Sequence, residues 1–153
     1  MEAIRYVRIS EGQLLPPLND LRPFRTVVVL NSSYSEDWQF EVSDWLVAEG
    51  CMYMMAWGPD STKWDDSVDY AVRKANPGDE TPDDKFVMTT WHPEETLEDV
   101  FWYCQFCAGV SYNDVALDRT VILDISNEDR EAELLALFER SKSLAEREDA
   151  EGD

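Results

Sequence analysis

Apolar residues along this chain gather in four short runs, and each run is followed by a longer segment in which apolar residues recur with helical spacing. Three of the runs are almost uniformly apolar, which is typical of strands buried on both faces of a parallel sheet. The fourth, Phe86–Thr89, is more mixed. The uniform runs are Thr26–Leu30, Cys51–Ala56 and Thr120–Ile125.

Turn and capping residues separate each run from its helix. Ser35 is a favourable N-cap for the first helix, and Gly50 is a typical residue for its end. Turns at Trp57–Asp60 and at Thr90–Pro93 precede the second and third helices, and Ser126 is expected to cap the last one.

Strands that alternate with helices of this length predict parallel βαβ units. We therefore expect an α/β fold, a three-layer Rossmann-like or flavodoxin-like sandwich with helices on both faces of four main strands. Counting from Thr26–Leu30, the expected strand order is 2-1-3-4. The domain is expected to cover residues 25–145. Residues 1–24, with a short edge strand at Ile4–Ile9, would pack on it, and residues 146–153 would form a frayed acidic tail.

The expected strand order reverses direction between the first and third strands. Ligands of open α/β sheets bind beyond the carboxyl ends of the strands at such a switch point. The loops Asn31–Tyr34 and Thr89–His92 would face each other there, with Trp57–Asp60 beside them. The ligand-binding candidates are therefore Asn31, Ser32, Trp57, Asp60, Thr89, Thr90, Trp91 and His92.

His92 is the single histidine of the chain. As a general acid or base it needs an orienting carboxylate, for which Glu94, Glu95 or Asp60 are available. The alternative is that His92 only caps the following helix. Because no nucleophile accompanies it in sequence, no residue is assigned a catalytic role.

Metal and cofactor motifs are weak. Asp65, Asp66 and Asp69 fall opposite the apolar stripe of their helix, which is typical of a solvated acidic face. Cys104 and Cys107 form a CxxC pair within a helix, and their spacing predicts core thiols rather than a redox or zinc site. Glycine-rich phosphate loops are absent from the sequence. No metal and no cofactor are therefore expected.

The charge balance limits the class of partner. The 33 acidic residues against 13 basic ones give a net charge of −20. Such a surface repels nucleic acid and anionic membranes and attracts basic proteins, although acidity also serves solubility alone. Charges throughout the N-terminal stretch argue against a secretory signal, and three cysteines fit a reducing compartment, so a cytoplasmic location is expected.

Some aromatic residues fall outside the helical core stripes. Phe40 lies on the outer side of the first helix, and Trp102 and Phe106 lie on the outer side of the third. Either the N-terminal segment covers these residues, or they form a protein interface, where aromatic residues are enriched. They are the interface candidates, and a homodimer stays open.

Two runs, AWGPDSTKWDDSVDYAV and FVMTTWHPEETLEDVFWY, resemble the signatures of an uncharacterised bacterial family of small acidic α/β proteins that is assigned only a domain of unknown function. The resemblance covers about Phe24 to Ser126. It implies no activity and therefore assigns no roles. The matching positions are Trp57, Asp60, Trp64, Asp65, Asp66, Asp69, Trp91 and His92.

Two functional hypotheses follow from the sequence. The first is a cytoplasmic acidic binding protein, in its most specific form an immunity-type protein that neutralises a basic bacterial toxin or effector. The second is a small-molecule-binding or enzymatic α/β domain that uses the crevice of Trp57, Trp91 and His92. The charge and the lack of a catalytic set favour the first.

Overall fold

The computed structural model describes residues 3–78, 81, 85–108 and 117–151. Five parallel strands form one sheet. They are β1 (Ala3–Ile9), β2 (Phe24–Leu30), β3 (Cys51–Trp57), β4 (Met88–His92) and β5 (Arg119–Ile125). The helices are α1 (Glu36–Glu49), α2 (Trp64–Ala75), α3 (Leu97–Phe106) and α4 (Glu131–Glu151), with short 3-10 turns η1 (Asn19–Leu21) and η2 (Ser61–Lys63).

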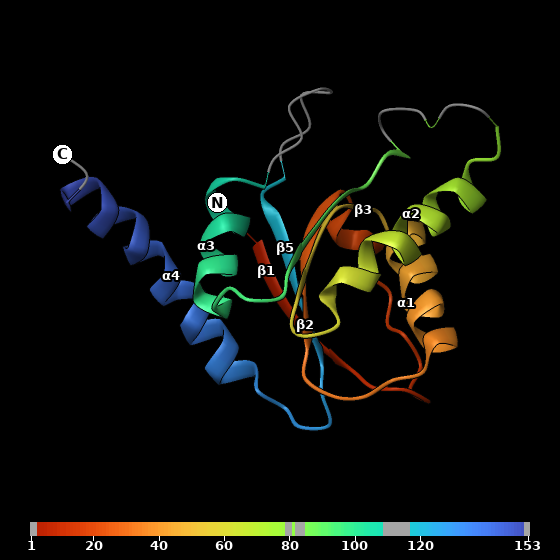
Figure 1. Cartoon of the computed structure of the whole chain (residues 1–153), viewed down its shortest axis with the longest axis horizontal. Coiled ribbons are helices and arrows are strands. Elements are labelled where there is room, and N and C mark those ends of the chain that lie inside the picture. Colours follow the sequence, from red (N-terminus) through yellow and green to blue (C-terminus); the bar gives the residue numbers. More distant parts are fainter. Residues whose placement is uncertain (1–2, 79–80, 82–84, 109–116, 152–153) are drawn as a thin grey trace.

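The helices cover both faces of the sheet in pairs (Figure 1). Helices α1 and α2 share one hydrophobic core with the sheet, and α3 and α4 share the other. Apolar residues on alternate positions of the central strands therefore supply two separate cores: Val28 and Leu123 point to the first, and Val27 and Ile122 to the second. The predicted three-layer α/β sandwich with a parallel sheet is confirmed.

The strand order is β1-β5-β2-β3-β4, so the predicted number and order of strands are wrong. The order 2-1-3-4 placed the strand near residue 88 between β2 and β5, whereas β4 lies at the outer edge beside β3. The reason is burial. β2 is buried along its whole length and β3 and β5 along nearly all of theirs, but β4 and β1 carry partly exposed residues, which only an edge position allows.

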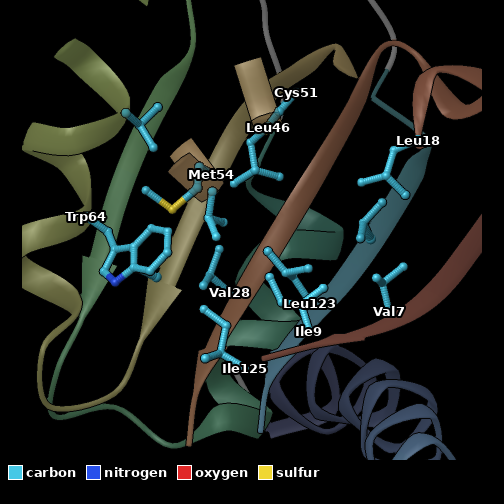
Figure 2. Packing of buried hydrophobic residues seen from close by; sticks show 14 of the residues in the cluster. Val7, Ile9, Leu18, Val28, Leu46, Cys51, Met54, Trp64, Leu123 and Ile125 are labelled. Atoms are coloured by element: carbon cyan, nitrogen blue, oxygen red, sulfur yellow. The ribbon is translucent and has the colours of Figure 1, made fainter. Parts of the chain in front are cut away.

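The first strand belongs to the sheet itself. β1 pairs in parallel with β5 over its full length, from Ala3 beside Arg119 to Ile9 beside Ile125. The chain then passes beside α1, where Trp45 Nε1 donates to the carbonyl of Pro16 at 2.9 Å and Leu18 is buried. Figure 2 shows Val7, Ile9 and Leu18 in the same core as residues of β2 and β5.

β4 starts and ends later than predicted. The expected strand was Phe86–Thr89 followed by a turn, but Thr90, Trp91 and His92 continue the strand beside Met55, Ala56 and Trp57. Threonine and tryptophan favour extended backbone, which explains the extension. Consecutive side chains therefore alternate between the two faces of the sheet rather than gathering in one loop.

The helix ends are partly as predicted. Ser35 Oγ accepts from Trp38 N at 3.2 Å, and Gly50 ends α1 with φ 107°. The predicted cap of the last helix is wrong, because Ser126 Oγ accepts from Glu128 N in a turn and α4 begins at Glu131. Helix α4 continues to Glu151, beyond the expected domain end at residue 145.

Candidate functional site

The reversal of strand order lies between β2 and β5. These strands are neighbours, yet β2 leads to α1 on one face and β5 leads towards α4 on the other (Figure 1). The predicted crevice between the loops Asn31–Tyr34 and Thr89–His92 is therefore wrong, since β3 separates the two strands. Asn31 does lie at the actual switch point, where its N–H donates to the carbonyl of Ile125 at 3.0 Å.

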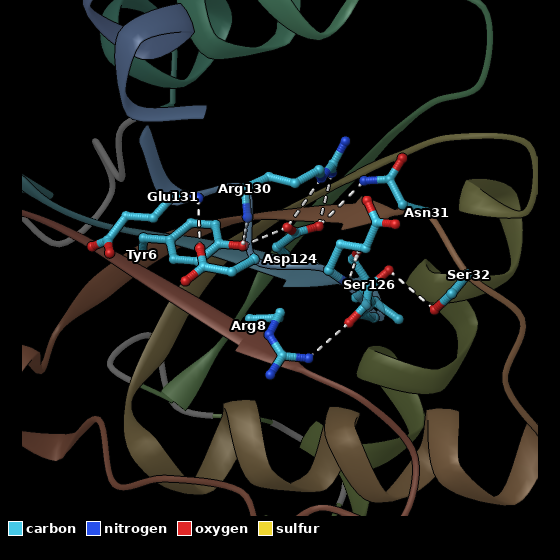
Figure 3. Close-up of polar contacts among 11 residues, drawn as sticks. Tyr6, Arg8, Asn31, Ser32, Asp124, Ser126, Arg130 and Glu131 are labelled. Carbon is cyan, nitrogen blue, oxygen red and sulfur yellow. Dashed lines mark hydrogen bonds and ion pairs between the residues drawn. The ribbon is translucent and has the colours of Figure 1, made fainter. Parts of the chain in front are cut away.

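A buried carboxylate occupies this switch point. Asp124, near the end of β5, is fully buried and accepts hydrogen bonds on both oxygens (Figure 3). Oδ1 accepts from Asn31 Nδ2 at 3.2 Å and from Arg130 Nη2 at 2.9 Å. Oδ2 accepts from the Tyr6 hydroxyl at 2.6 Å and from Arg130 Nε at 3.3 Å. The carboxylate is thus saturated by the protein's own donors.

The Asp124 network joins four parts of the chain. Tyr6 comes from β1, Asn31 follows β2, and Arg130 precedes α4. The Tyr6 hydroxyl also accepts from Arg130 N at 3.0 Å. Burial, with the neighbouring Asp124 carboxylate, raises the pKa of Tyr6 to about 12. These contacts fill the switch point with protein, so the arrangement locks the strand ends together and offers no open carboxylate to a ligand.

Sequence reasoning missed Tyr6, Asp124 and Arg130. One signal was present: Asp124 interrupts an otherwise apolar buried strand. A charged residue in such a strand requires partners, because an unpaired buried carboxylate is strongly unfavourable.

His92 lies elsewhere, under α3. Its Nδ1 is 2.9 Å from Glu95 Oε1 and its Nε2 is 2.9 Å from Thr90 Oγ1, and its ring lies 5.3 Å from that of Tyr103. Of the three carboxylates proposed to orient His92, it is therefore Glu95 that contacts the imidazole ring. The hydroxyl–imidazole–carboxylate alignment is suited to proton transfer. However, His92 is only 6% exposed, so it does not line an open crevice.

The other predicted ligand-binding residues do not converge. Trp57 Nε1 donates to the carbonyl of Glu95 at 2.7 Å, beside His92. Trp91 is 47% exposed at the sheet edge, and Thr89 lines a hollow between α2 and β4. Asp60 lines a different groove, described next.

A groove of about 450 Å³ lies between the first turns of α1 and α2, beyond the carboxyl ends of β2 and β3. We call it the acidic groove, because three carboxylates and one ammonium group line it. Its residues are Tyr34, Glu36, Gln39, Phe40, Asp60, Lys63 and Asp66. It carries only one of the interface candidates, Phe40, and one of the ligand-binding candidates, Asp60.

The acidic groove continues into a second hollow of about 470 Å³ lined by Phe40, Asp66, Tyr70 and Arg73. The rings of Phe40 and Tyr70 meet edge to face, with centroids 5.8 Å apart and an interplanar angle of 87°. Lys74 Nζ lies 5.2 Å from the centre of the Tyr70 ring. Tyr70 therefore already holds one cation of the protein itself on its ring.

Buried polar contacts fix the two walls of the acidic groove. Gln39 Nε2 donates to the carbonyl of Lys63 at 3.0 Å and to Ser67 Oγ at 3.1 Å. Ser43 Oγ lies 2.8 Å from Ser67 Oγ, which ties α1 to α2. The small serine side chains let the helices approach closely, and these hydrogen bonds hold the two walls of the groove together.

Trp102 and Phe106 form a separate aromatic pair on α3, with ring centroids 5.9 Å apart. Phe106 is exposed, and the buried indole N–H of Trp102 has no acceptor among the described residues. The N-terminal segment packs against α1 in the opposite layer, so it does not cover this pair. Cys107 is exposed at the end of α3 and is not the core thiol predicted, whereas Cys104 is buried.

Within the described ranges, no three His, Cys, Asp or Glu side chains are grouped so that they could hold a metal ion. Nor does any helix in that part of the chain combine the length and the apolar character needed to cross a membrane.

A family model matches residues 4–141. The chain belongs to the family defined by the domain of unknown function DUF7684. The DUF7684 match includes β2 to β5, α1 to α3, and nearly all of β1. Neither a curated protein nor a solved structure matches the chain significantly. Membership in DUF7684 therefore supports the family resemblance, and it assigns no activity.

Proposed function

We propose that this protein binds a basic protein partner and that the partner docks at the acidic groove. One observation carries the proposal. The Phe40–Tyr70 ring pair lies beside the carboxylates of Glu36, Asp60 and Asp66, in two hollows that share lining residues. Aromatic side chains give an interface its apolar contact area, and carboxylates select for basic groups. The groove thus combines the two chemistries that such a partner needs.

The arrangement of the basic side chains supports this proposal. Arg5, Lys74, Arg130, Arg140 and Lys142 are ion-paired with carboxylates of the same chain. Four further arginines donate to the chain's own oxygens: Arg8, Arg22, Arg25 and Arg119. Most cations of the described residues are therefore engaged internally, and the net charge of −20 is available to an approaching basic protein.

The proposal assigns different roles to the two kinds of residue. The negative field accelerates the encounter and is screened within about 10 Å at 0.1 M salt. The Phe40–Tyr70 pair would hold the complex once formed, because buried aromatic contacts slow dissociation and are little affected by salt. In its specific form the protein is a cytoplasmic immunity-type protein whose partner is a basic toxin or effector.

The second candidate function is a small-molecule-binding or enzymatic domain. It is favoured by the alignment of Thr90, His92 and Glu95, with Trp57 hydrogen-bonded beside it. A ligand of this site would raise the melting temperature through binding to the folded state. We expect no such rise with ATP, NAD or GTP, and a reproducible rise of several degrees that His92→Gln abolishes would favour the second candidate.

The first proposal is tested by capturing the partner from the cell of origin and measuring its binding kinetics across a salt series. We expect a basic partner and an association rate that falls steeply as salt rises. Phe40→Ala and Tyr70→Ala should raise the dissociation rate. Trp102→Ala and Phe106→Ala are the matched controls, because they remove the aromatic pair in the opposite layer.

An acidic partner, or association indifferent to salt, would contradict the proposed function. If Trp102→Ala and Phe106→Ala raise the dissociation rate while Phe40→Ala and Tyr70→Ala do not, the partner docks on α3 and the groove assignment is wrong.

A further inference from the structure

We infer that the outer edge of β4 receives an extended segment of the basic partner as an additional strand. This inference rests on the proposed function and names how the partner is held. Exposed strand edges bind extended peptides through their unpaired backbone groups, with side-chain hollows on either face supplying specificity.

The two edges of the sheet differ in chemistry. The β1 edge carries Arg5 and Arg8, which are bonded to Asp20 and to the carbonyl of Ser126. Charged residues of this kind discourage pairing with another strand. The β4 edge has the sequence MTTWH without a charged residue, and Met88 and Trp91 are 41% and 47% exposed. One edge is therefore protected and the other is open.

The backbone of β4 is paired on one side only. Its partner is β3, and the carbonyl of His92 accepts from Gly58 N, which directly follows β3. No other described residue forms a backbone hydrogen bond with Met88 to Trp91. The described residues thus leave unpaired the N–H and C=O groups that point away from β3, and an added strand would pair with them.

A hollow of about 320 Å³ adjoins this edge on the side of α2. Phe86, Met88 and Val72 provide apolar walls, Asp69 provides a carboxylate, and Arg73 provides a guanidinium group. Side chains of an added strand alternate between the faces of the sheet. An apolar residue of the segment would fill this hollow, and a basic residue would lie near Asp69.

The edge hollow adjoins the docking site proposed above at one shared residue. Arg73 lines both this hollow and the hollow of Phe40 and Tyr70. A partner seated in the acidic groove would therefore reach the β4 edge across the outer side of α2. One partner engages both features without any rearrangement of the domain.

Charge decides between a partner segment and a second copy of this chain. Two copies joined edge to edge would bring together two domains that each carry −20. In the edge hollow the carboxylate of Asp69 lies together with the guanidinium group of Arg73, and exposed Glu94 comes two residues after β4. The net charge of −20 attracts a basic segment, whereas it repels a second copy.

The test uses a short synthetic peptide of alternating arginine and valine, acetylated and amidated at its ends. Its control is the same peptide with every second amide N-methylated, which keeps the charge and removes backbone donors from one edge. NMR of the intact protein should show slower amide exchange in Met88 to Trp91 with the first peptide only. We expect the N-methylated peptide to bind at least about tenfold more weakly, from the loss of several hydrogen bonds.

A charge-matched pair of variants locates the site. Trp91→Lys places a positive charge on the β4 edge, and Leu14→Lys makes the same charge change at a 91% exposed residue that follows β1. Trp91→Lys should weaken peptide binding strongly and Leu14→Lys only slightly. Circular dichroism of both variants confirms that they fold.

Equal binding of the two peptides, or equal effects of the two lysine variants, would overturn strand addition at β4. Without peptide, the amides of Met88 to Trp91 could instead exchange more slowly as the protein concentration rises. That result would show that a second copy occupies the edge, and it would also overturn strand addition by the partner. Neither result bears on the Phe40 and Tyr70 variants in the salt series, so a failure here is distinguishable from failure of the proposed function.

Discussion

Arg130 binds Asp124 through two side-chain nitrogens, with Nη2 2.9 Å from Oδ1 and Nε 3.3 Å from Oδ2. The Asp124 carboxylate is fully buried, while the Arg130 side chain is 23% exposed. Such a pair is weak evidence for net stability, but removing one partner leaves a buried charge uncompensated. The pair therefore fixes where β5 ends and where the chain turns towards α4.

Arg130→Ala should lower the free energy of unfolding by about 2–4 kcal/mol, since Tyr6 and Asn31 replace only part of the lost compensation. Urea denaturation measures the change. Arg140→Ala, which breaks an exposed pair with Glu98, is the control and should cost less than about 1 kcal/mol. Equal costs for the two variants would mean that Asp124 is not held as described.

Because of Tyr6, the protein should lose stability in alkaline solution. Burial and Asp124 raise the pKa of Tyr6 from 10.0 to about 12 in the folded state. The folded protein therefore retains a proton that the unfolded chain has lost, and this contribution is present below pH 10 and disappears as the pH approaches 12. Denaturation series at rising pH should show a smaller alkaline loss for Tyr6→Phe, and an unchanged slope would contradict this assignment.

Replacing His92 should lower the stability of the fold rather than leave it unchanged. Because its buried ring has partners on both nitrogens, His92→Ala should destabilise the fold by about 1–3 kcal/mol. Glu95→Gln should cost less than His92→Ala, since the amide still offers an oxygen. Exposed Glu94 serves as the control through Glu94→Gln, which should leave the melting temperature unchanged. Thermal denaturation of the three variants tests this order.

The cysteines should differ in reactivity. Cys107 is exposed, whereas Cys51 and Cys104 are buried, and burial raises the pKa of the Cys51 thiol to about 12. A native thiol assay should label one cysteine rapidly, and Cys107→Ser should remove this fast phase. Denaturation should expose the other two. Two fast thiols in the native protein would contradict the placement of Cys104.

Gly50 should not tolerate alanine. A Cβ there would lie 2.6 Å from Arg22 Cγ, and φ is already +107°. Arg22 donates to the carbonyls of Ala48 and Glu49, so displacing it also removes the side-chain donor of these two carbonyls. Gly12→Ala is the matched control, because Gly12 has φ +92° but nothing within 4 Å. Gly50→Ala should therefore lower the melting temperature by more than Gly12→Ala.

The sequence indicated the elements more reliably than their arrangement. The runs at Thr26–Leu30, Cys51–Ala56 and Thr120–Ile125 are strands because unbroken apolar stretches are stable only when both faces are covered. The predicted strand order was wrong because it placed β4, whose sequence mixes polar and apolar residues, in the centre of the sheet. Its two threonines and exposed Met88 and Trp91 suit an edge, where one side of the strand faces solvent.

Candidate site residues were harder to group than to find. Asp60 and Phe40 do line the acidic groove, but Tyr70 lies thirty residues after Phe40 and meets it only because Ser43 and Ser67 let α1 and α2 pack closely. His92 and Trp91 were expected side by side, and the alternation of a strand sends them to opposite faces.

The sequence by itself determined that this protein is a parallel α/β sandwich with an acidic surface, because periodicity and charge are local properties that no distant contact alters. Tertiary structure alone decided which strands lie at the edges, that Tyr6, Asn31 and Arg130 meet at Asp124, and that Phe40 and Tyr70 share one groove. These depend on how helices and strands far apart in the chain pack together. No spacing along the sequence encodes those distances.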